Sequence, residues 1–164
     1  MQIEQFDTGL KIKKNIEDVE ITPIQNLNNK KFVIENFRNI YGLKKINLKK
    51  NLLNIFDKDI KVNCFEPLNE FNGIDNFIEK FWNPLFDAFP DIERRENIIL
   101  GGSFRDKVQV GSYSTLSGFF LKPWLGIKPN FKIINLKCCE IHEIKNERII
   151  DSHILIDVMD FLRQ

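Results

Sequence analysis

The sequence predicts an α+β domain in which helices come first and an antiparallel sheet follows. Apolar residues recur at helical spacing over residues 28–89, whereas from residue 92 onward they alternate as in strands. The fifteen Phe residues indicate a core or cavity lined by aromatic rings. A chain of 164 residues suits one domain, so we expect an N-terminal arm over residues 1–27 and the domain over residues 28–164.

Three segments have helical spacing. The first begins at residue 28 and stops at Gly42, which can adopt the left-handed conformation of a helix end. A short second helix covers residues 48–56. The third helix starts near Asp75, whose carboxylate can cap free amides, and we expect Pro84 to kink it.

A short strand is predicted over residues 59–65, between the second and third helices. Four longer strands are predicted at residues 92–100, 107–120, 131–144 and 148–158. A two-residue turn at Asn146-Glu147 would pair Leu136 with Asp157, Glu140 with His153, and His142 with Asp151, all on one face of the sheet. Arg94, Arg95 and Arg105 are expected to face water.

Charge and composition exclude several classes of protein. The net charge of +1 leaves no basic footprint of the kind that nucleic-acid binding requires, so we expect no nucleic-acid partner. No apolar stretch approaches the length of a membrane span, and residues 1–7 do not begin a secretory signal, so we expect no membrane partner and a cytoplasmic protein. The three cysteines lack metal-ligand spacing, and we expect no metal site.

Four local strings, in order along the chain, carry a family resemblance. They are WNPLFDAFPD at 82–91, LGIKP at 125–129, RII at 148–150 with a late aspartate, and DVMDFLRQ at 157–164. Together they resemble the SnoaL-like polyketide cyclase family, within the nuclear transport factor two-like superfamily, from about residue 30 to the C-terminus. One departure is the turn Asn146-Glu147, where the family usually has Asp-Gly.

The resemblance implies a cone, also described as a cystatin-like α+β barrel, in which a strongly bent sheet wraps around three N-terminal helices and encloses an apolar cavity. Such cavities bind flat or cyclic organic molecules, and the family's enzymes use carboxylates for proton transfer without a metal or cofactor. The aspartate before the final "LLRQ" is the family's general acid/base, and its position here is Asp157. An enclosed Asp157 could act on a proton next to a carbonyl, but the same residue could instead cap the C-terminal turn.

Other polar residues could assist such a reaction. Tyr113, Asn63 or His153 could steady an enolate, with His153 held by Glu140, although a plain surface pair is the alternative for this histidine. Aromatic residues expected to form pocket walls, or simply to belong to the core, are Trp82, Phe86, Phe119 and Trp124.

The sequence therefore predicts a cofactor-independent cyclase or isomerase that acts on a small apolar carbonyl compound by an intramolecular aldol or enolisation reaction. A non-catalytic pocket protein is the alternative from another class, and a hydrolase or dehydratase on the same fold is a third. We also expect a homodimer, formed through the strands at residues 131–144 and 148–158.

Overall fold

The computed structural model describes residues 21–164, so most of the predicted N-terminal arm lies outside it. Helix α1 (Pro23–Leu43) begins within the last residues of that arm, earlier than its apolar pattern predicts. The Thr22 hydroxyl accepts a hydrogen bond from the Gln25 amide, and the Gln25 side chain accepts one from the Thr22 amide. This capping box, followed by a proline at the first helical position, explains the earlier start.

Three short helical segments follow, and the one predicted over residues 48–56 ends at Leu53, because Phe56 already begins a strand. They are α2 (Leu48–Leu53), α3 (Ile74–Phe77) and α4 (Asn83–Ala88). Between the last two lies a π-helical turn, η1 (Ile78–Trp82), in which the Asn83 amide donates to the Ile78 carbonyl. Pro84 has no amide hydrogen to donate, and the wider turn just before it is the predicted disturbance. A C-terminal helix, α5 (Val158–Arg163), ends the chain.

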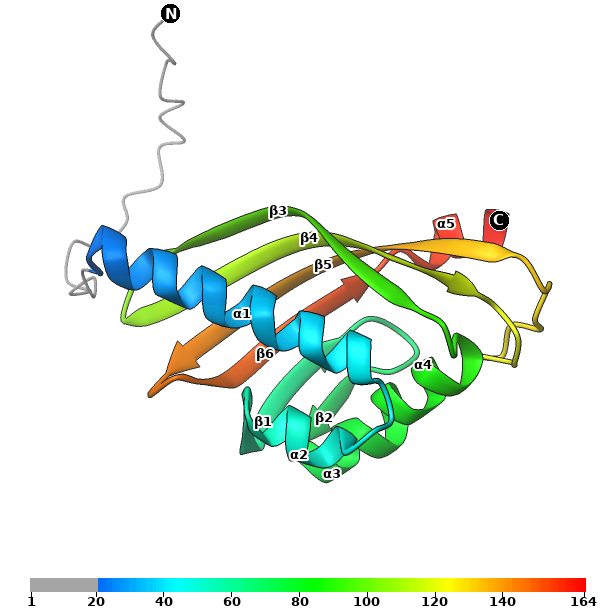
Figure 1. The fold of residues 1–164 in the computed structure, drawn as a ribbon, viewed down its shortest axis with the longest axis horizontal. Helices are drawn as coiled ribbons and strands as arrows, with labels where there is room; N and C mark the ends of the chain where they lie inside the picture. The colour runs from blue at the N-terminus through cyan, green and yellow to red at the C-terminus, as the bar shows by residue number, and fades with distance from the viewer. Residues whose placement is uncertain (1–20) are drawn as a thin grey trace, which may run out of the picture.

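Six strands form one curved sheet that is not closed, and helices precede most of it, so the predicted α+β class is confirmed (Figure 1). The strands are β1 (Phe56–Cys64), β2 (Glu70–Asn72), β3 (Glu93–Phe104), β4 (Lys107–Phe119), β5 (Ile133–Lys145) and β6 (Arg148–Ile156). Their order is β2-β1-β6-β5-β4-β3, and β1 runs parallel to β6 while all other pairs are antiparallel. Helix α1 lies across one face, which we call the inner face (Figure 1).

Aromatic side chains build the core on the inner face in two clusters. The first lies under α1 and contains Phe37, Tyr41, Phe56, Phe77, Phe81, Trp82 and Phe86. The second lies toward α5 and contains Phe65, Phe89, Phe120, Trp124 and Phe161. From residue 21 onward, no helix combines the length and apolar character that crossing a membrane requires.

The predicted pairing of the last two strands holds only near their turn. Lys145 pairs with Arg148 and Ile144 with Ile149, but the register then shifts, so that Glu143 lies opposite Asp151. A shift of one residue moves side chains to the other face of a sheet. The pairs of Glu140 with His153, His142 with Asp151, and Leu136 with Asp157 are therefore wrong. Glu140 and His142 face inward, where they lie opposite Ile154 and Ser152. The partners predicted for this face, Asp151, His153 and Asp157, lie on the outer side of the sheet instead.

Candidate functional site

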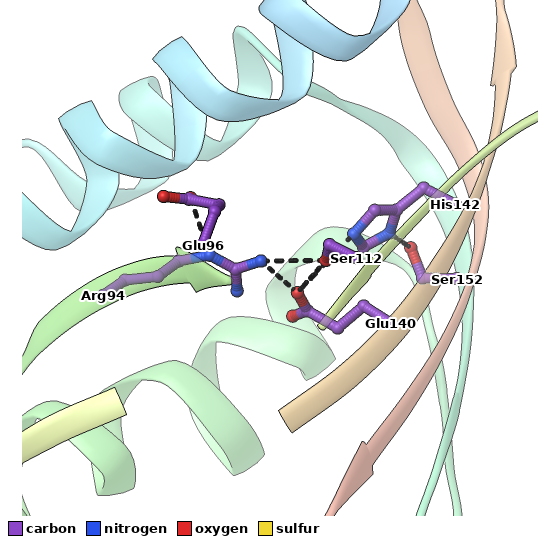
Figure 2. A network of polar contacts seen from close by, with 6 residues as sticks. All are labelled: Arg94, Glu96, Ser112, Glu140, His142 and Ser152. Atoms are coloured by element: carbon purple, nitrogen blue, oxygen red, sulfur yellow. Dashed lines mark hydrogen bonds and ion pairs between the residues drawn. The ribbon is translucent and has the colours of Figure 1, made fainter. Parts of the chain in front are cut away.

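A cluster of polar side chains lies on the inner face of the sheet, beneath α1 (Figure 2). We call it the inner polar cluster, and four neighbouring strands contribute to it. Its members are Arg94 and Glu96 from β3, Ser112 from β4, Glu140 and His142 from β5, and Ser152 from β6. Alternation along each strand directs all six side chains to the same side.

A buried ion pair forms the centre of this cluster. The Arg94 guanidinium lies 2.5 Å from the Glu140 carboxylate, and these side chains are only 1% and 4% exposed. Ser112 completes the contact, because its hydroxyl accepts from Arg94 at 3.0 Å and donates to Glu140 at 3.2 Å. Arg94 also donates to Glu96 at 3.1 Å. Paired in this way, both charges can persist in the interior.

Burial and pairing act against each other on the pKa of both members of this pair. Burial alone would raise the pKa of Glu140, but the charge of Arg94, the neighbouring His142 and the hydrogen bonds from Arg94 and Ser112 together hold that pKa below its ordinary value. Burial alone would lower the pKa of Arg94, but Glu140, together with smaller effects of Tyr41 and Cys138, raises it above its ordinary value. For Tyr41, which lies against Arg94, burial raises the phenol pKa. The interior thus holds a carboxylate, a guanidinium and a neutral phenol.

His142 is fully buried beside this ion pair. Its Nδ1 lies 2.9 Å from the Ser152 hydroxyl, and its Nε2 lies 3.9 Å from the Glu140 carboxylate. Burial lowers the imidazole pKa to about 4, against the partial compensation of Glu140. His142 is therefore neutral at neutral pH, and it carries a nitrogen lone pair that can accept a proton.

Several buried polar atoms near the inner polar cluster have no hydrogen-bond partner among the described residues. They are Nε2 of His142, one terminal nitrogen of Arg94, Nε1 of Trp82 and Oγ of Ser114. Buried polar atoms in folded proteins are nearly always paired, so such a group of unpaired atoms needs an explanation. Donors from Arg94 and Trp82 and an acceptor or donor on His142 could together hold an oxygen-bearing organic molecule.

The predicted catalytic residue Asp157 lies elsewhere. Its carboxylate is exposed and accepts a hydrogen bond of 2.8 Å from the Asp160 amide at the start of α5. Of the two possibilities for Asp157, the structure shows the cap of the C-terminal turn. Apolar walls do not enclose the carboxylate, because the register shift turns it outward and the helix start offers free amides. Tyr113, half-buried on the outer face, lines the same outer hollow of about 480 Å³ as Asp157.

The predicted residues His153 and Asn63 meet on the outer face as well. They are neighbours across the parallel β1 and β6 strands, and both line a second hollow of about 330 Å³. His153 lies 3.3 Å from Asp151, in place of the predicted contact with Glu140. The structure thus brings Asp157 together with Tyr113, and Asn63 together with His153, while their catalytic and binding roles stay predictions.

The four predicted wall residues divide among three places. Trp82 and Phe86 are buried in the first aromatic cluster, where their rings contact each other. Trp124 is buried in the second cluster, and Phe119 is 42% exposed near the end of β4. Of these, only Trp82 and Phe86 lie near the inner polar cluster, since both contact Tyr41.

Comparison with protein families identifies the chain. The model of the SnoaL-like polyketide cyclase family matches residues 44–164. The chain belongs to this family. Comparison with curated proteins found no match.

Solved structures share the fold of this SnoaL-like protein at low sequence identity. A putative SnoaL-like polyketide cyclase from Jannaschia sp. CCS1 aligns with a TM-score of 0.71 and 15% identity, covering 88% of this chain and 94% of the other. TsrD from Streptomyces laurentii aligns with a TM-score of 0.68 and 14% identity, covering 88% and 97%. AclR, a putative hydroxylase from Streptomyces galilaeus, gives 0.65 and 14%, covering 84% and 95%. At this identity, the likeness shows the fold alone.

Arg94 was expected to face water, yet its side chain is buried. A signal was present, because Arg94 follows the apolar Ile92 by two residues in the strand predicted over residues 92–100, and residues two apart in a strand point to the same side. Glu140 and His142 likewise continue the inward alternation of Leu136 and Cys138.

Within residues 21–164, no three His, Cys, Asp or Glu side chains converge as metal ligands.

Proposed function

We propose that this SnoaL-like protein is a cyclase or isomerase that enolises a small apolar carbonyl compound at the inner polar cluster. The observation that carries this proposal is the pair of unpartnered groups, Nε2 of His142 and a terminal nitrogen of Arg94. The two residues flank the same Glu140 oxygen: Nε2 of His142 lies 3.9 Å from it, and the other terminal nitrogen of Arg94, which is paired, lies 2.5 Å from it. A neutral base beside a cation in a water-poor interior suits proton abstraction next to a carbonyl.

Each group has a distinct role in this reaction. The lone pair on Nε2 of His142 takes a proton from the carbon next to the carbonyl, and the C–H electrons form the enolate. Arg94 donates a hydrogen bond to the enolate oxygen, where negative charge develops. Glu140 holds Arg94 in position and stabilises the imidazolium. Return of the proton to another carbon gives isomerisation, and attack of the enolate carbon on a second carbonyl gives cyclisation.

The test uses 2-tetralone, a flat bicyclic ketone, as a probe in deuterium oxide. We expect the wild-type protein to accelerate exchange of the protons next to the carbonyl above the buffer rate, as followed by proton NMR. His142→Gln keeps a neutral polar side chain but removes the basic imidazole, and it should lower the protein-dependent exchange rate by about 10²- to 10⁴-fold.

Asp157→Asn is the matched comparison, because Asp157 is a second candidate base. The specific observation in its favour is the outer hollow that it shares with Tyr113. Exchange that survives in His142→Gln but disappears in Asp157→Asn would contradict the role of the inner polar cluster and support the outer hollow. Binding of 2-tetralone without exchange above buffer would instead favour the non-catalytic pocket protein. A hydrolase or dehydratase reaction stays a further alternative, and the cytoplasmic location stays a prediction.

The predicted homodimer would bury the outer face of the sheet. Large apolar side chains are exposed there, namely Ile98, Leu100, Ile141 and Leu155, at 54%, 67%, 48% and 60%. Patches of this kind on a protein surface mark interaction sites. We expect the wild-type protein to be a dimer, with Ile141 and Leu155 in its interface. We expect its substrate to be a small organic molecule.

Light scattering coupled to size-exclusion chromatography measures this directly. The double substitution Ile141→Lys and Leu155→Lys places two charges on the apolar face and should convert the dimer to monomer at micromolar concentration. Ile46→Lys, at a similarly exposed position outside the sheet, is the matched control and should leave the dimer intact. A wild-type monomer at this concentration would remove the prediction.

A further inference from the structure

Phe37 packs against two members of the inner polar cluster although it is itself apolar. Its ring stacks on His142 with centroids 5.2 Å apart and an interplanar angle of 27°. The Arg94 guanidinium lies over the same ring, 4.5 Å from its centroid. The centroid of the Trp82 ring lies 6.5 Å from that of Phe37. A flat ligand ring in this place would be held by the same stacking and cation–π contacts.

Each of the three groups around Phe37 also carries an unpaired polar atom. Nε2 of His142, a terminal nitrogen of Arg94 and Nε1 of Trp82 are buried and unpaired among the described residues. A phenylalanine ring carries no oxygen or nitrogen. The face of the Phe37 ring can therefore pack against these three groups, but it cannot form the hydrogen bonds that they lack. A ring of similar size with an oxygen substituent could do both.

We infer that the Phe37 ring occupies the slot of the ligand's ring, and that Phe37 must leave this slot before a ligand binds. This inference rests on the proposed function for the identity of the site, and it adds the residue that blocks it. Phe37 then determines specificity, because only a ligand that offers an oxygen to Arg94, His142 or Trp82 gains more than Phe37 already supplies. An apolar ring alone gains nothing over the resident side chain.

Truncation of Phe37 tests this inference without any need for turnover. Phe37→Ala opens a cavity of ring size, and phenol and toluene are probes of nearly equal size, of which only phenol carries an oxygen. Calorimetry gives the ratio of their affinities for each variant. Phe71→Ala is the matched control, since Phe71 is equally buried but stacks on the hydrocarbon ring of Phe77.

We expect the phenol-to-toluene affinity ratio to be at least about tenfold higher in Phe37→Ala than in Phe71→Ala, as a hydrogen bond to a charged group provides. Equal ratios in the two variants would overturn the inference, because the slot would then be an ordinary apolar cavity. Absence of proton exchange together with a raised ratio would reject the proposed reaction but leave the inference intact. Proton exchange together with equal affinity ratios would support the proposed reaction but overturn the inference about Phe37.

The wild-type protein provides a second measurement that does not depend on the folding of a variant. At saturating 2-tetralone, we expect nuclear Overhauser contacts between the probe and the His142 ring, and loss of the contacts between the rings of Phe37 and His142. Contacts between Phe37 and His142 that persist unchanged at saturation would overturn the inference.

Discussion

Arg94→Met is expected to lower the free energy of unfolding by about 3–5 kcal/mol at neutral pH, measured by urea denaturation. Methionine can fill much of the volume of the arginine stem, but it leaves the Glu140 carboxylate buried without its cation. Ser112 alone cannot compensate for that charge. The large effect is the cost of an uncompensated buried charge rather than the net contribution of the pair.

The pH dependence of this variant follows from the pKa of Glu140. In the wild-type protein Arg94 holds the pKa of Glu140 below its ordinary value. The ionised pair therefore stabilises the fold fully at pH values above the ordinary carboxyl pKa. This stabilisation is lost as the pH falls through the lowered pKa of the folded protein. Without Arg94, burial raises the pKa of Glu140 instead. Glu140 then takes up a proton in the folded variant as the pH falls, so the deficit relative to wild type should shrink.

Two comparisons separate the ion pair from the loss of a long side chain. Arg95→Met alters the neighbouring residue, which is exposed, and should change the free energy of unfolding by no more than about 0.5 kcal/mol. The double substitution Arg94→Met and Glu140→Leu removes both charges and should recover most of the loss. A single variant Arg94→Met as stable as wild type at neutral pH would show that the pair is not buried.

Acidification is expected to destabilise the wild-type protein through His142. Its pKa is about 4 in the folded protein and has an ordinary value of 6.5, so between these values only the unfolded chain takes up the proton. Stability therefore falls as the pH falls from 6.5 toward 4, by about 3 kcal/mol from this group at 1.36 kcal/mol per pH unit. Urea denaturation at a series of pH values measures the slope.

The two histidines of the chain provide a matched pair for this measurement. His142→Gln removes the buried titrating group and should flatten the decline of stability over this pH range. His153→Gln alters a side chain that is 61% exposed and should keep the wild-type slope. Equal slopes for wild type and His142→Gln would contradict the burial of a neutral imidazole at this position.

Much of the fold could be predicted because period and turn signals are local. The alternation along β5 and the helical spacing in α1 give the inner face of each element. The early start of α1 was also readable, since Thr22 and Gln25 have the spacing of a capping box. The Pro84 disturbance was readable for the same reason, as it depends on one missing amide hydrogen.

The predicted pairs of His153 and Asp157 were wrong because the hairpin register shifts by one residue on a strand that also pairs with β1. Strand β6 pairs with β5 on one side and with β1 on the other, and Ile149 lies beside both Ile144 and Phe56. Asp151 is the next residue of β6 to pair on both sides. Against β5 this leaves Ile150 as an extra residue, whereas against β1 residues 57–60 stand opposite that single residue. A turn rule for the hairpin alone contains no information about β1. This single residue decides that His153 and Asp157 face outward.

Nitrogen-15 NMR of the two histidine side chains, assigned with His153→Gln and followed at neutral pH during a titration with 2-tetralone, tests most directly whether the inner polar cluster is the functional site. We predict that His142 is a neutral imidazole in one tautomer, with Nδ1 bonded to Ser152, and that its Nε2 resonance shifts as the probe binds. A His142 resonance that stays unchanged at saturating 2-tetralone while the His153 resonance moves would contradict the inner site.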